Sequence, residues 1–590
     1  MPDHSYLQPD PTNQRPLTWR VWAVLAVITL GYTWFYYRKM LSGPLVINDD
    51  MVQHYLWLFV EHFGLDWKDM FYADASAAIQ PRGFYWLLKM LGLVFDPVTI
   101  SRAGPFLISL LTVGFGLAFL RRFTHLFIAL AGCLLAAHLG FHSSVGFVAR
   151  AFFIPLIVAF AYFLIGREQP WGVAIVALCS ALFYPPALLL NGGIFGLWKL
   201  GQLIVWWRGR RMQGAPILGY RLSPPGGRVE GADRPPSPLV YWYVYLLGFG
   251  LALLVVWLHA ERVATHPALG GYLDPAALTS WPEFRSDGRV RIYDVVKGDV
   301  ASLYRYLLTA NFTPLGKSSA YALLMLAGLS SLFHRRTLGK FGWWLLVIAV
   351  VATVWYFIAR QFFPLLFLPD RYLVYPWRLW APMVLTLVAA GIWRFQPKSW
   401  LAGLLAVGLL GYGYYRQPPE NLPTTSQEGR ELLFAALSAL PEAALIALPP
   451  TLADQVPVFT HRNVFISHES AHALYFKNYH DYIMPRFHDF VTAYTTTGDS
   501  LGNVVDFMDK WQIDYFLVDR HQLKSNWLRT FEPHQGYFRE RIEGTTREER
   551  TLLNLPDSVG VLIQERLHLV SRGELEKLAD AKDPAGVDPD

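Results

Sequence analysis

The sequence predicts an α-helical membrane protein of about eleven spans, followed by a C-terminal α/β domain outside the cytoplasm. Of the 590 residues, 53% are apolar and only 16% are charged, whereas an average soluble protein carries about 25% charged residues. The mean hydropathy is +0.27. Apolar runs near the length of a membrane helix recur up to residue 415, and short strand-like runs alternate with helical stretches beyond it.

Residues 1–17 are polar and are expected to form a cytoplasmic tail. No small-residue cleavage site follows the first apolar run, so we expect it to remain as an anchor. Residues 84–95 are apolar but too few to span, which predicts an interfacial or re-entrant helix. The expected spans form a transmembrane domain over residues 18–415 and cover 18–37, 103–120, 124–141, 147–166, 171–190, 191–207, 239–258, 319–334, 341–362, 378–394 and 399–415.

Basic residues set the orientation, because cytoplasmic loops carry the excess of Arg and Lys. A cytoplasmic N-terminus places nearly every basic cluster inside, with Arg38-Lys39 as the exception. The first external loop is then 38–102 and the second large one is 259–318. The prediction is a multi-pass protein of the plasma (inner) membrane whose C-terminal domain is extracytoplasmic. The inside clusters are Arg121-Arg122, Arg167, the loop 208–238, His334-Arg335-Arg336, and Arg394 with Lys398.

A basic net charge can indicate nucleic-acid binding, and this chain has a net charge of +6 and a pI near 9.0. Its Arg and Lys residues lie in short loops between apolar runs, which is typical of membrane topology and not of a nucleic-acid face. We therefore expect the lipid bilayer as a partner and no nucleic acid. Cys133 and Cys179 both lie in apolar runs, so no disulfide framework is predicted.

The C-terminal domain is expected over residues 416–581, with a disordered tail at 582–590. Its strand-like runs and the helical stretch Leu501–Trp511 predict an α/β sandwich with a small parallel sheet. Exposed tyrosines are expected to stack on sugar rings or to lie at the membrane interface. These tyrosines are Tyr475, Tyr479 and Tyr482, and the predicted strands are 443–448, 463–466, 514–518 and 559–563.

Two adjacent carboxylates, Asp49 and Asp50, follow the first span at the start of an expected helix. Carboxylates are costly at the edge of the apolar layer, which favours a functional role. Their repulsion would raise one pKa and give a better general base. Alternatively they hold a divalent cation, Mg or Mn. The structural interpretation is a cap and a first-turn acid. Asp50 is the favoured base because Asp49 is the better cap, and His54 lies one turn later on the same face.

These features resemble the GT-C superfamily of membrane glycosyltransferases, which includes protein O-mannosyltransferases, aminoarabinose transferases and oligosaccharyltransferase catalytic subunits. The resemblance rests on an inside N-terminus, many spans, an acidic motif in a helical first external loop and an outside C-terminal domain. Gln80-Pro81-Arg82-Gly83-Phe84-Tyr85 is similar to the Pro-aromatic segment that follows the acidic motif, and Leu368-Pro369-Asp370-Arg371-Tyr372 to a late Arg-bearing external motif. The chain lacks the Trp-Trp-Asp signature of oligosaccharyltransferases.

The resemblance implies an inverting transfer of a sugar from a polyprenyl-phosphate carrier to an extracytoplasmic acceptor, which would be an envelope glycan, a lipid or a protein. No G-x-G-x-x-G or Walker A motif is present, consistent with a donor that is not a nucleotide. Asp50, with Asp49, would be the base or a metal ligand. An anionic leaving group needs positive partners. The implied substrate-binding residues are Arg371, Arg150, His54, Arg82, Tyr184 and Arg378.

Two of these residues also have a structural interpretation. Arg371 would snorkel to the interface or pair with Asp370, and His54 would be an ordinary interfacial histidine. Tyr184 precedes two prolines that break a helix, which could shape a groove for the lipid tail.

Two other functions compete with this hypothesis. His468-Glu469-Ser470-Ala471-His472 matches H-E-x-x-H, so His468, Glu469 and His472 could serve a membrane zinc protease, provided that the motif is helical. It follows a strand-like run directly, and a pattern this short also arises by chance. The non-enzymatic alternative is a transporter or an envelope-assembly scaffold. Transporters usually carry polar residues at mid-membrane and repeated halves, and the spans here show little of either.

Overall fold

The computed structural model describes residues 16–42, 46–47, 49–211, 241–275, 278, 284, 301, 316–366, 368–416, 425–426, 429–470, 475–498, 501–524, 550–564 and 566–582. Several predictions therefore lie outside the described residues. They concern most of the loop 208–238, most of the external loop 259–318, His472, and residues 583–590 of the tail.

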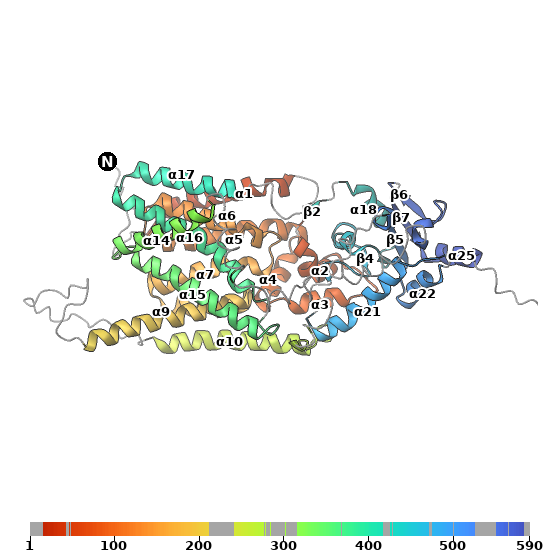
Figure 1. Cartoon of the computed structure of the whole chain (residues 1–590), viewed down its shortest axis with the longest axis horizontal. Coiled ribbons are helices and arrows are strands. Elements are labelled where there is room, and N and C mark those ends of the chain that lie inside the picture. The colour runs from red at the N-terminus through yellow and green to blue at the C-terminus, as the bar shows by residue number, and fades with distance from the viewer. Residues whose placement is uncertain are drawn as a thin grey trace, which may run out of the picture.

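Long helices form a bundle whose axes run along the longest dimension of the molecule (Figure 1). Within it, α10 packs on α8, α5 and α17 pack on α6, and α15 packs on α16. The helices are α1 (Trp19–Ser42), α5 (Pro97–Leu120), α6 (Leu126–Ser144), α7 (Phe153–Ala161), α8 (Pro170–Phe183), α9 (Pro185–Arg211), α10 (Trp242–Thr265), α14 (Gly316–Phe333), α15 (Gly339–Gln361), α16 (Arg371–Phe395) and α17 (Ser399–Arg416).

The bundle has the length and composition of a membrane domain. Three of its apolar helical segments are shorter than the length needed to cross a membrane: Leu126–Phe141, Pro170–Phe183 and Tyr321–Phe333. The predicted fold class of a helical membrane protein with a C-terminal α/β domain is confirmed. Six described helices are long and apolar enough to cross a membrane: Pro97–Leu120, Ala149–Arg167, Pro185–Val205, Trp242–Thr265, Gly339–Gln361 and Arg371–Phe395.

One predicted span boundary is wrong. We expected a break between residues 190 and 191, but the chain leaves the helix at Tyr184, whose backbone is non-helical (φ −154°, ψ 88°). Pro185 and Pro186 then begin α9, where their missing N–H groups cost nothing because the first turn of a helix leaves its N–H groups unpaired. The 27 residues of α9, which begin with these prolines, form one continuous helix that runs through the expected break.

Three shorter helices lie between the bundle and the C-terminal domain: α2 (Asp49–Phe63), α3 (Phe71–Ile79) and α4 (Arg82–Gly92) (Figure 1). The 11 residues of α4 bury Phe84 and Leu88 and expose Trp86 and Met90, as expected of a half-buried helix too short to span. Just before α2, strand β1 (Val46–Ile47) pairs antiparallel with β2 (Thr425–Ser426), which follows the last helix of the bundle.

The C-terminal domain packs helices around a five-stranded sheet at one end of the bundle (Figure 1). Its strands are β3 (Leu445–Ala447), β4 (Asn463–Val464), β5 (Tyr515–Asp519), β6 (Val561–Ile563) and β7 (Leu567–Ser571). Its helices are α18 (Glu431–Ser438), α19 (Pro450–Ala453), α20 (Val456–Thr460), α21 (Lys477–Tyr494), α22 (Gly502–Lys510), α23 (Arg520–Lys524) and α25 (Arg572–Lys582), with a 3₁₀ turn, η10, at Thr551–Asn554.

The sheet is mixed, which corrects the prediction of a small parallel sheet. The strand order is β4-β3-β5-β7-β6. β3 runs parallel to β4 and β5, whereas β7 runs antiparallel to β5 and β6. The sequence prediction missed β7, which follows β6 through a tight turn with Gln564 at φ 54°. A turn of this length can join only antiparallel neighbours. The four predicted strands are present, and α22 confirms the predicted helix at 501–511.

Candidate functional site

A cavity of about 260 Å³ lies where the beginnings of α2, α9 and α16 meet the end of α10. Its lining combines charged and polar side chains with aliphatic ones. We call it the main cavity. Five of the residues predicted for the site line it: Asp50, His54, Arg150, Tyr184 and Arg371.

Asp50 and Arg150 form an ion pair in the wall of the main cavity. Arg150 Nη1 donates to Asp50 Oδ1 at 2.9 Å, and its Nη2 pairs with Oδ2, so the contact is bidentate. Burial raises the pKa of Asp50, but Arg150, His54 and Arg371 together outweigh burial and the net shift of the pKa is downward. The expectation of a raised pKa is therefore corrected for Asp50. The side chain of Asp49 is not among those described.

A strained turn places Arg150. After α6, Gly146 (φ 81°) and Phe147 (φ 49°) adopt left-handed backbone conformations, which are costly for a residue such as Phe147. Tyr55 of α2 donates its hydroxyl to the Phe147 carbonyl at 2.7 Å. A Cβ at Gly104 of α5 would come within 1.9 Å of the Phe147 ring, so glycine is required there. The chain then enters the short 3₁₀ helix η2 (Ala149–Phe152), which carries Arg150 opposite α2.

His54 lies one turn after Asp50 and is held by Gln80. The Nε2 group of Gln80 contacts His54 Nδ1 at 2.9 Å and also donates to the Ser76 carbonyl at 2.9 Å. Burial lowers the pKa of His54 from 6.5 to about 4, although Asp50 and Glu469 raise it. The imidazole is therefore neutral near pH 7. Because Gln80 donates to Nδ1, the remaining proton is on Nε2.

Acid is expected to destabilise the protein through His54. Its pKa in the folded state is about 4, below the ordinary value of about 6.5, so the unfolded chain binds the proton first as the pH falls. The stability contributed by the neutral imidazole is present above pH 6.5 and is lost between about pH 6.5 and about pH 4. We expect the apparent unfolding midpoint to drop less over this window in His54→Gln than in the wild type. His62→Gln, an exposed histidine on the same helix, should match the wild type, and an equal drop in all three would contradict the assignment.

Arg371 is the first residue of α16, and its guanidinium has no ion pair with the neighbouring Asp370. The guanidinium carbon lies 5.2 Å from the centre of the Tyr375 ring. The Nε of Arg371 and the Oδ1 of Asp370 are both buried, and neither has a hydrogen-bond partner among the described residues. Arg371 thus brings a positive charge to the cavity with hydrogen-bonding capacity to spare.

Two of the predicted residues do not line the main cavity. Arg378 lies two turns further along α16, its guanidinium carbon is 5.8 Å from the centre of the Tyr375 ring, and it donates to Ser143 Oγ at 2.6 Å. It lines a separate, much smaller cavity. Arg82 is exposed at the start of α4. Tyr184 does line the main cavity, and its hydroxyl is buried without a described partner.

No group of three or more His, Cys, Asp or Glu side chains forms a metal site among the described residues. Both carboxylate oxygens of Asp50 accept from Arg150, and the side chain of Asp49 is not among those described, so the Mg or Mn ion stays a prediction. In the H-E-x-x-H motif, His468 and Glu469 lie in a turn after β4 and not in a helix. Glu469 is buried, and its N–H donates to Asp454 Oδ1 at 2.7 Å.

The C-terminal domain closes part of the main cavity, which sequence reasoning missed. Tyr475 and Phe476 line the cavity, and Phe476 forms an antiparallel bridge with Tyr272, which follows α10. Tyr475 and Tyr479 are only 3% and 5% exposed, so the expectation that they are exposed is wrong. Their position before and within α21 offered no local signal of this burial.

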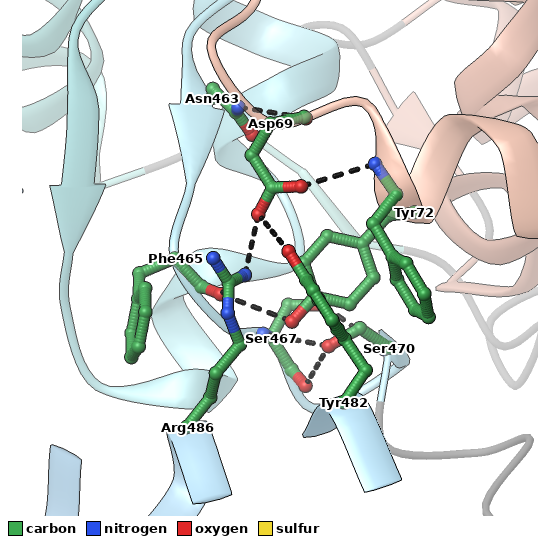
Figure 2. A network of polar contacts seen from close by, with 9 residues as sticks. Asp69, Tyr72, Asn463, Phe465, Ser467, Ser470, Tyr482 and Arg486 are labelled. Carbon is green, nitrogen blue, oxygen red and sulfur yellow. Dashed lines mark hydrogen bonds and ion pairs between the residues drawn. The ribbon is translucent and has the colours of Figure 1, made fainter. Parts of the chain in front are cut away.

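A second contact joins the loop 64–70 between α2 and α3, with the start of α3, to the same domain (Figure 2). Asp69 pairs with Arg486 of α21 and accepts the Tyr482 hydroxyl at 2.8 Å. Arg486 also donates to the Phe465 carbonyl at 3.1 Å, and this carbonyl accepts the Tyr72 hydroxyl at 3.0 Å. Phe71 stacks on Tyr482 with ring centres 3.6 Å apart, and the Asn463 amide donates to the Asp69 carbonyl at 3.0 Å. We call these residues the loop–domain junction.

No family model matches the sequence, and no curated protein matches it. Solved structures of an oligosaccharyltransferase from Archaeoglobus fulgidus are similar to the chain. The apo form is 10% identical with a TM-score of 0.47 and covers 88% of this chain and 72% of that one. The complex with an inhibitory peptide and a dolichol-phosphate is 10% identical with a TM-score of 0.45, over 86% and 70%. The complex with Zn and sulfate is 11% identical with a TM-score of 0.42, over 86% and 69%.

Proposed function

We propose that the protein is a membrane glycosyltransferase that takes a sugar from a polyprenyl-phosphate carrier on the extracytoplasmic side of the plasma membrane. One observation carries the proposal: the main cavity joins a carboxylate and two guanidinium groups to an aliphatic wall formed by membrane helices. A polyprenyl phosphate has the same two-part chemistry, with an anionic head and an apolar chain. The acceptor is proposed to be an envelope glycan, a lipid or a protein.

The aliphatic wall gives a lipid tail a path to the bilayer. Leu253 of α10 and Leu365, just before α16, both line the cavity. Their exposed fractions are 54% and 64%, respectively. These exposed apolar side chains support an opening of the cavity between α10 and the segment before α16, and burying an apolar lipid chain there is favourable.

The charged residues divide the chemical work. An acceptor hydroxyl placed beside Asp50 attacks the anomeric carbon, a C–O bond forms to the acceptor, and the bond from the anomeric carbon to the phosphate oxygen breaks. The carboxylate receives the hydroxyl proton, and the electron pair leaves with the phosphate. Arg371 is proposed to bind that phosphate, because its guanidinium has unused donors. Arg150 keeps Asp50 ionised and oriented, a role in addition to the phosphate contact implied by the resemblance.

The low pKa of Asp50 fits a late proton transfer. A carboxylate of low basicity accepts the proton only when the attacking oxygen has become acidic through bond formation. Attack from the face opposite the phosphate inverts the anomeric centre, which is the proposed stereochemistry. A role for Asp49 and Asp50 with a divalent cation stays a prediction, because the side chain of Asp49 is outside the described residues.

Binding of the carrier tests the proposal. We expect purified protein in nanodiscs to bind polyprenyl monophosphate, detected by native mass spectrometry, and Arg371→Gln to weaken binding about tenfold or more, since a charge-assisted hydrogen bond is lost. The matched control is Arg336→Gln. Arg336 is an exposed arginine in the turn before α15, whereas Arg371 lies beyond the end of that helix. At 1.5 Å per residue, the length of α15 places the two arginines about 35 Å apart. If no polyprenyl phosphate binds, or if both variants bind as the wild type does, the transporter or scaffold hypothesis replaces this one.

A further inference from the structure

A second group of basic side chains lies beside the main cavity, apart from Arg150 and Arg371. His259 lines the cavity from α10, and Arg262 follows it by one turn on the same face. Arg82, the first residue of α4, is close enough that its positive charge acts on both of them. We call Arg82, His259 and Arg262 the basic cluster. It brings residues from two helices to one place.

The basic cluster has hydrogen-bonding capacity that the described residues do not use. Arg262 Nη1 and His259 Nδ1 are both buried and lack a hydrogen-bond partner there. The Arg262 guanidinium carbon lies 5.9 Å from the centre of the Tyr85 ring, a contact that orients the group without using its N–H donors. Buried polar atoms are normally paired, so unpaired ones point to a missing partner.

The charge of the two guanidinium groups in the cluster, Arg82 and Arg262, is also unbalanced. No described carboxylate forms an ion pair with Arg82, His259 or Arg262. Of the described acids, Asp74 acts on His266, and Glu261, which precedes Arg262, is exposed. Helix α4 begins at the same place, and its N-cap, Pro81, provides no side-chain acceptor, so the positive end of the helix adds to the field. The missing partner is therefore an anion.

The position of the cluster indicates that the anion is borne by a lipid. Trp86 of α4 and Trp257 of α10 flank the cluster in sequence, and both are exposed by more than half. Exposed tryptophans gather at the level of lipid headgroups. From these observations we infer that the basic cluster is a second phosphate-binding subsite at the mouth of the main cavity.

Two lipids could supply that phosphate. One is the carrier itself, if it is a diphosphate; this source rests on the proposed function, with the first phosphate at Arg371 and the second at the cluster. The other is a phospholipid of the bilayer that occupies the mouth, which does not depend on the proposed function. Both present the same chemistry, a phosphate oxygen facing guanidinium and imidazole N–H groups.

The test compares three probes in phosphatidylcholine nanodiscs by native mass spectrometry: polyprenyl monophosphate, polyprenyl diphosphate and phosphatidylglycerol. The proteins are the wild type, Arg262→Gln, Arg371→Gln and the control Arg336→Gln. If the carrier supplies the phosphate, Arg262→Gln weakens diphosphate binding about tenfold and monophosphate binding less than about twofold. If a phospholipid supplies it, Arg262→Gln loses bound phosphatidylglycerol and leaves both polyprenyl ligands unchanged. Arg262→Lys, which keeps the charge, should retain most of the binding in either case.

The inference is overturned if Arg262→Gln behaves like Arg336→Gln with all three probes, or if it weakens monophosphate and diphosphate equally. Failure of the proposed function looks different. In that case Arg371→Gln leaves both polyprenyl ligands unchanged, or neither binds the wild type, and the phosphatidylglycerol arm still decides the fate of the subsite. Each variant is compared only if its size-exclusion profile matches that of the wild type.

Discussion

Replacing Asp50 by asparagine is expected to reduce sugar transfer by about 100-fold or more while leaving carrier binding within about twofold of the wild type. Asparagine preserves the size of the side chain and one acceptor for Arg150, but it cannot take the proton of an acceptor hydroxyl. The phosphate, in contrast, is expected to bind at Arg371, which the substitution does not touch. The loss should therefore fall on the chemical step.

The measurement is release of label from a panel of radiolabelled polyprenyl-phosphate sugars in membranes that contain the endogenous acceptors. Asp74→Asn is the matched control, because Asp74 is an exposed carboxylate on the neighbouring helix α3, and it should retain full activity. If Asp50→Asn keeps more than about a tenth of the wild-type rate, Asp50 does not act as the base.

Replacing Arg486 by alanine is expected to loosen the attachment of the C-terminal domain to the loop 64–70 between α2 and α3. The side chains of Arg486 and Asp69 are only 5% and 10% exposed, so the substitution leaves a buried carboxylate without its cation. Breaking such a pair costs about 3–5 kcal/mol. Arg486 also contacts the faces of Phe465, Tyr482 and Trp511, with its guanidinium carbon 4.4–5.2 Å from the ring centres, and these contacts are lost with it.

Hydrogen exchange should report this change as lost protection in α3 and α21, together with a lower apparent unfolding midpoint. The same loop provides the control: Lys68 pairs with Asp514 at 2.7 Å, but these side chains are 44% and 31% exposed, so Lys68→Ala should cost less than about 1 kcal/mol. The double replacement Asp69→Leu with Arg486→Met should be milder than Arg486→Ala alone, since it leaves no unpaired charge. Equal effects for Arg486→Ala and Lys68→Ala would contradict the interpretation.

The sequence located much of the site because alternation of spans sets which residues share one end of a helical bundle. Asp50, Arg150, Tyr184 and Arg371 were all predicted at external span edges, and all line one cavity. Alternation cannot resolve depth, however. Arg378 lies seven residues beyond Arg371, which is about 10 Å along a helix axis, and this offset separates it from the main cavity.

The pairing of charges could not be predicted. Asp50 and Arg150 are 100 residues apart, and their contact depends on the left-handed turn at Gly146 and Phe147, which no local pattern announces. Asp69 and Arg486 are 417 residues apart, and each stands among residues of ordinary loop or helix composition. Long-range polar contacts of this kind leave no periodicity in the sequence. Only the three-dimensional arrangement shows that the pKa of Asp50 is lowered.

The short ribbon of β1 and β2 has a mechanical consequence. Helix α2 is fastened at its start by this ribbon, which ties it to the segment leading into the C-terminal domain. Beyond its end, it is fastened by Trp67, which donates to the His461 carbonyl at 3.2 Å, and by the loop–domain junction. Because α2 is held at both ends, we expect Asp50 to keep its position relative to the C-terminal domain. Under the proposed function, we expect a long lipid to load, and the spent carrier to leave, between α10 and the segment before α16, both of which line the main cavity.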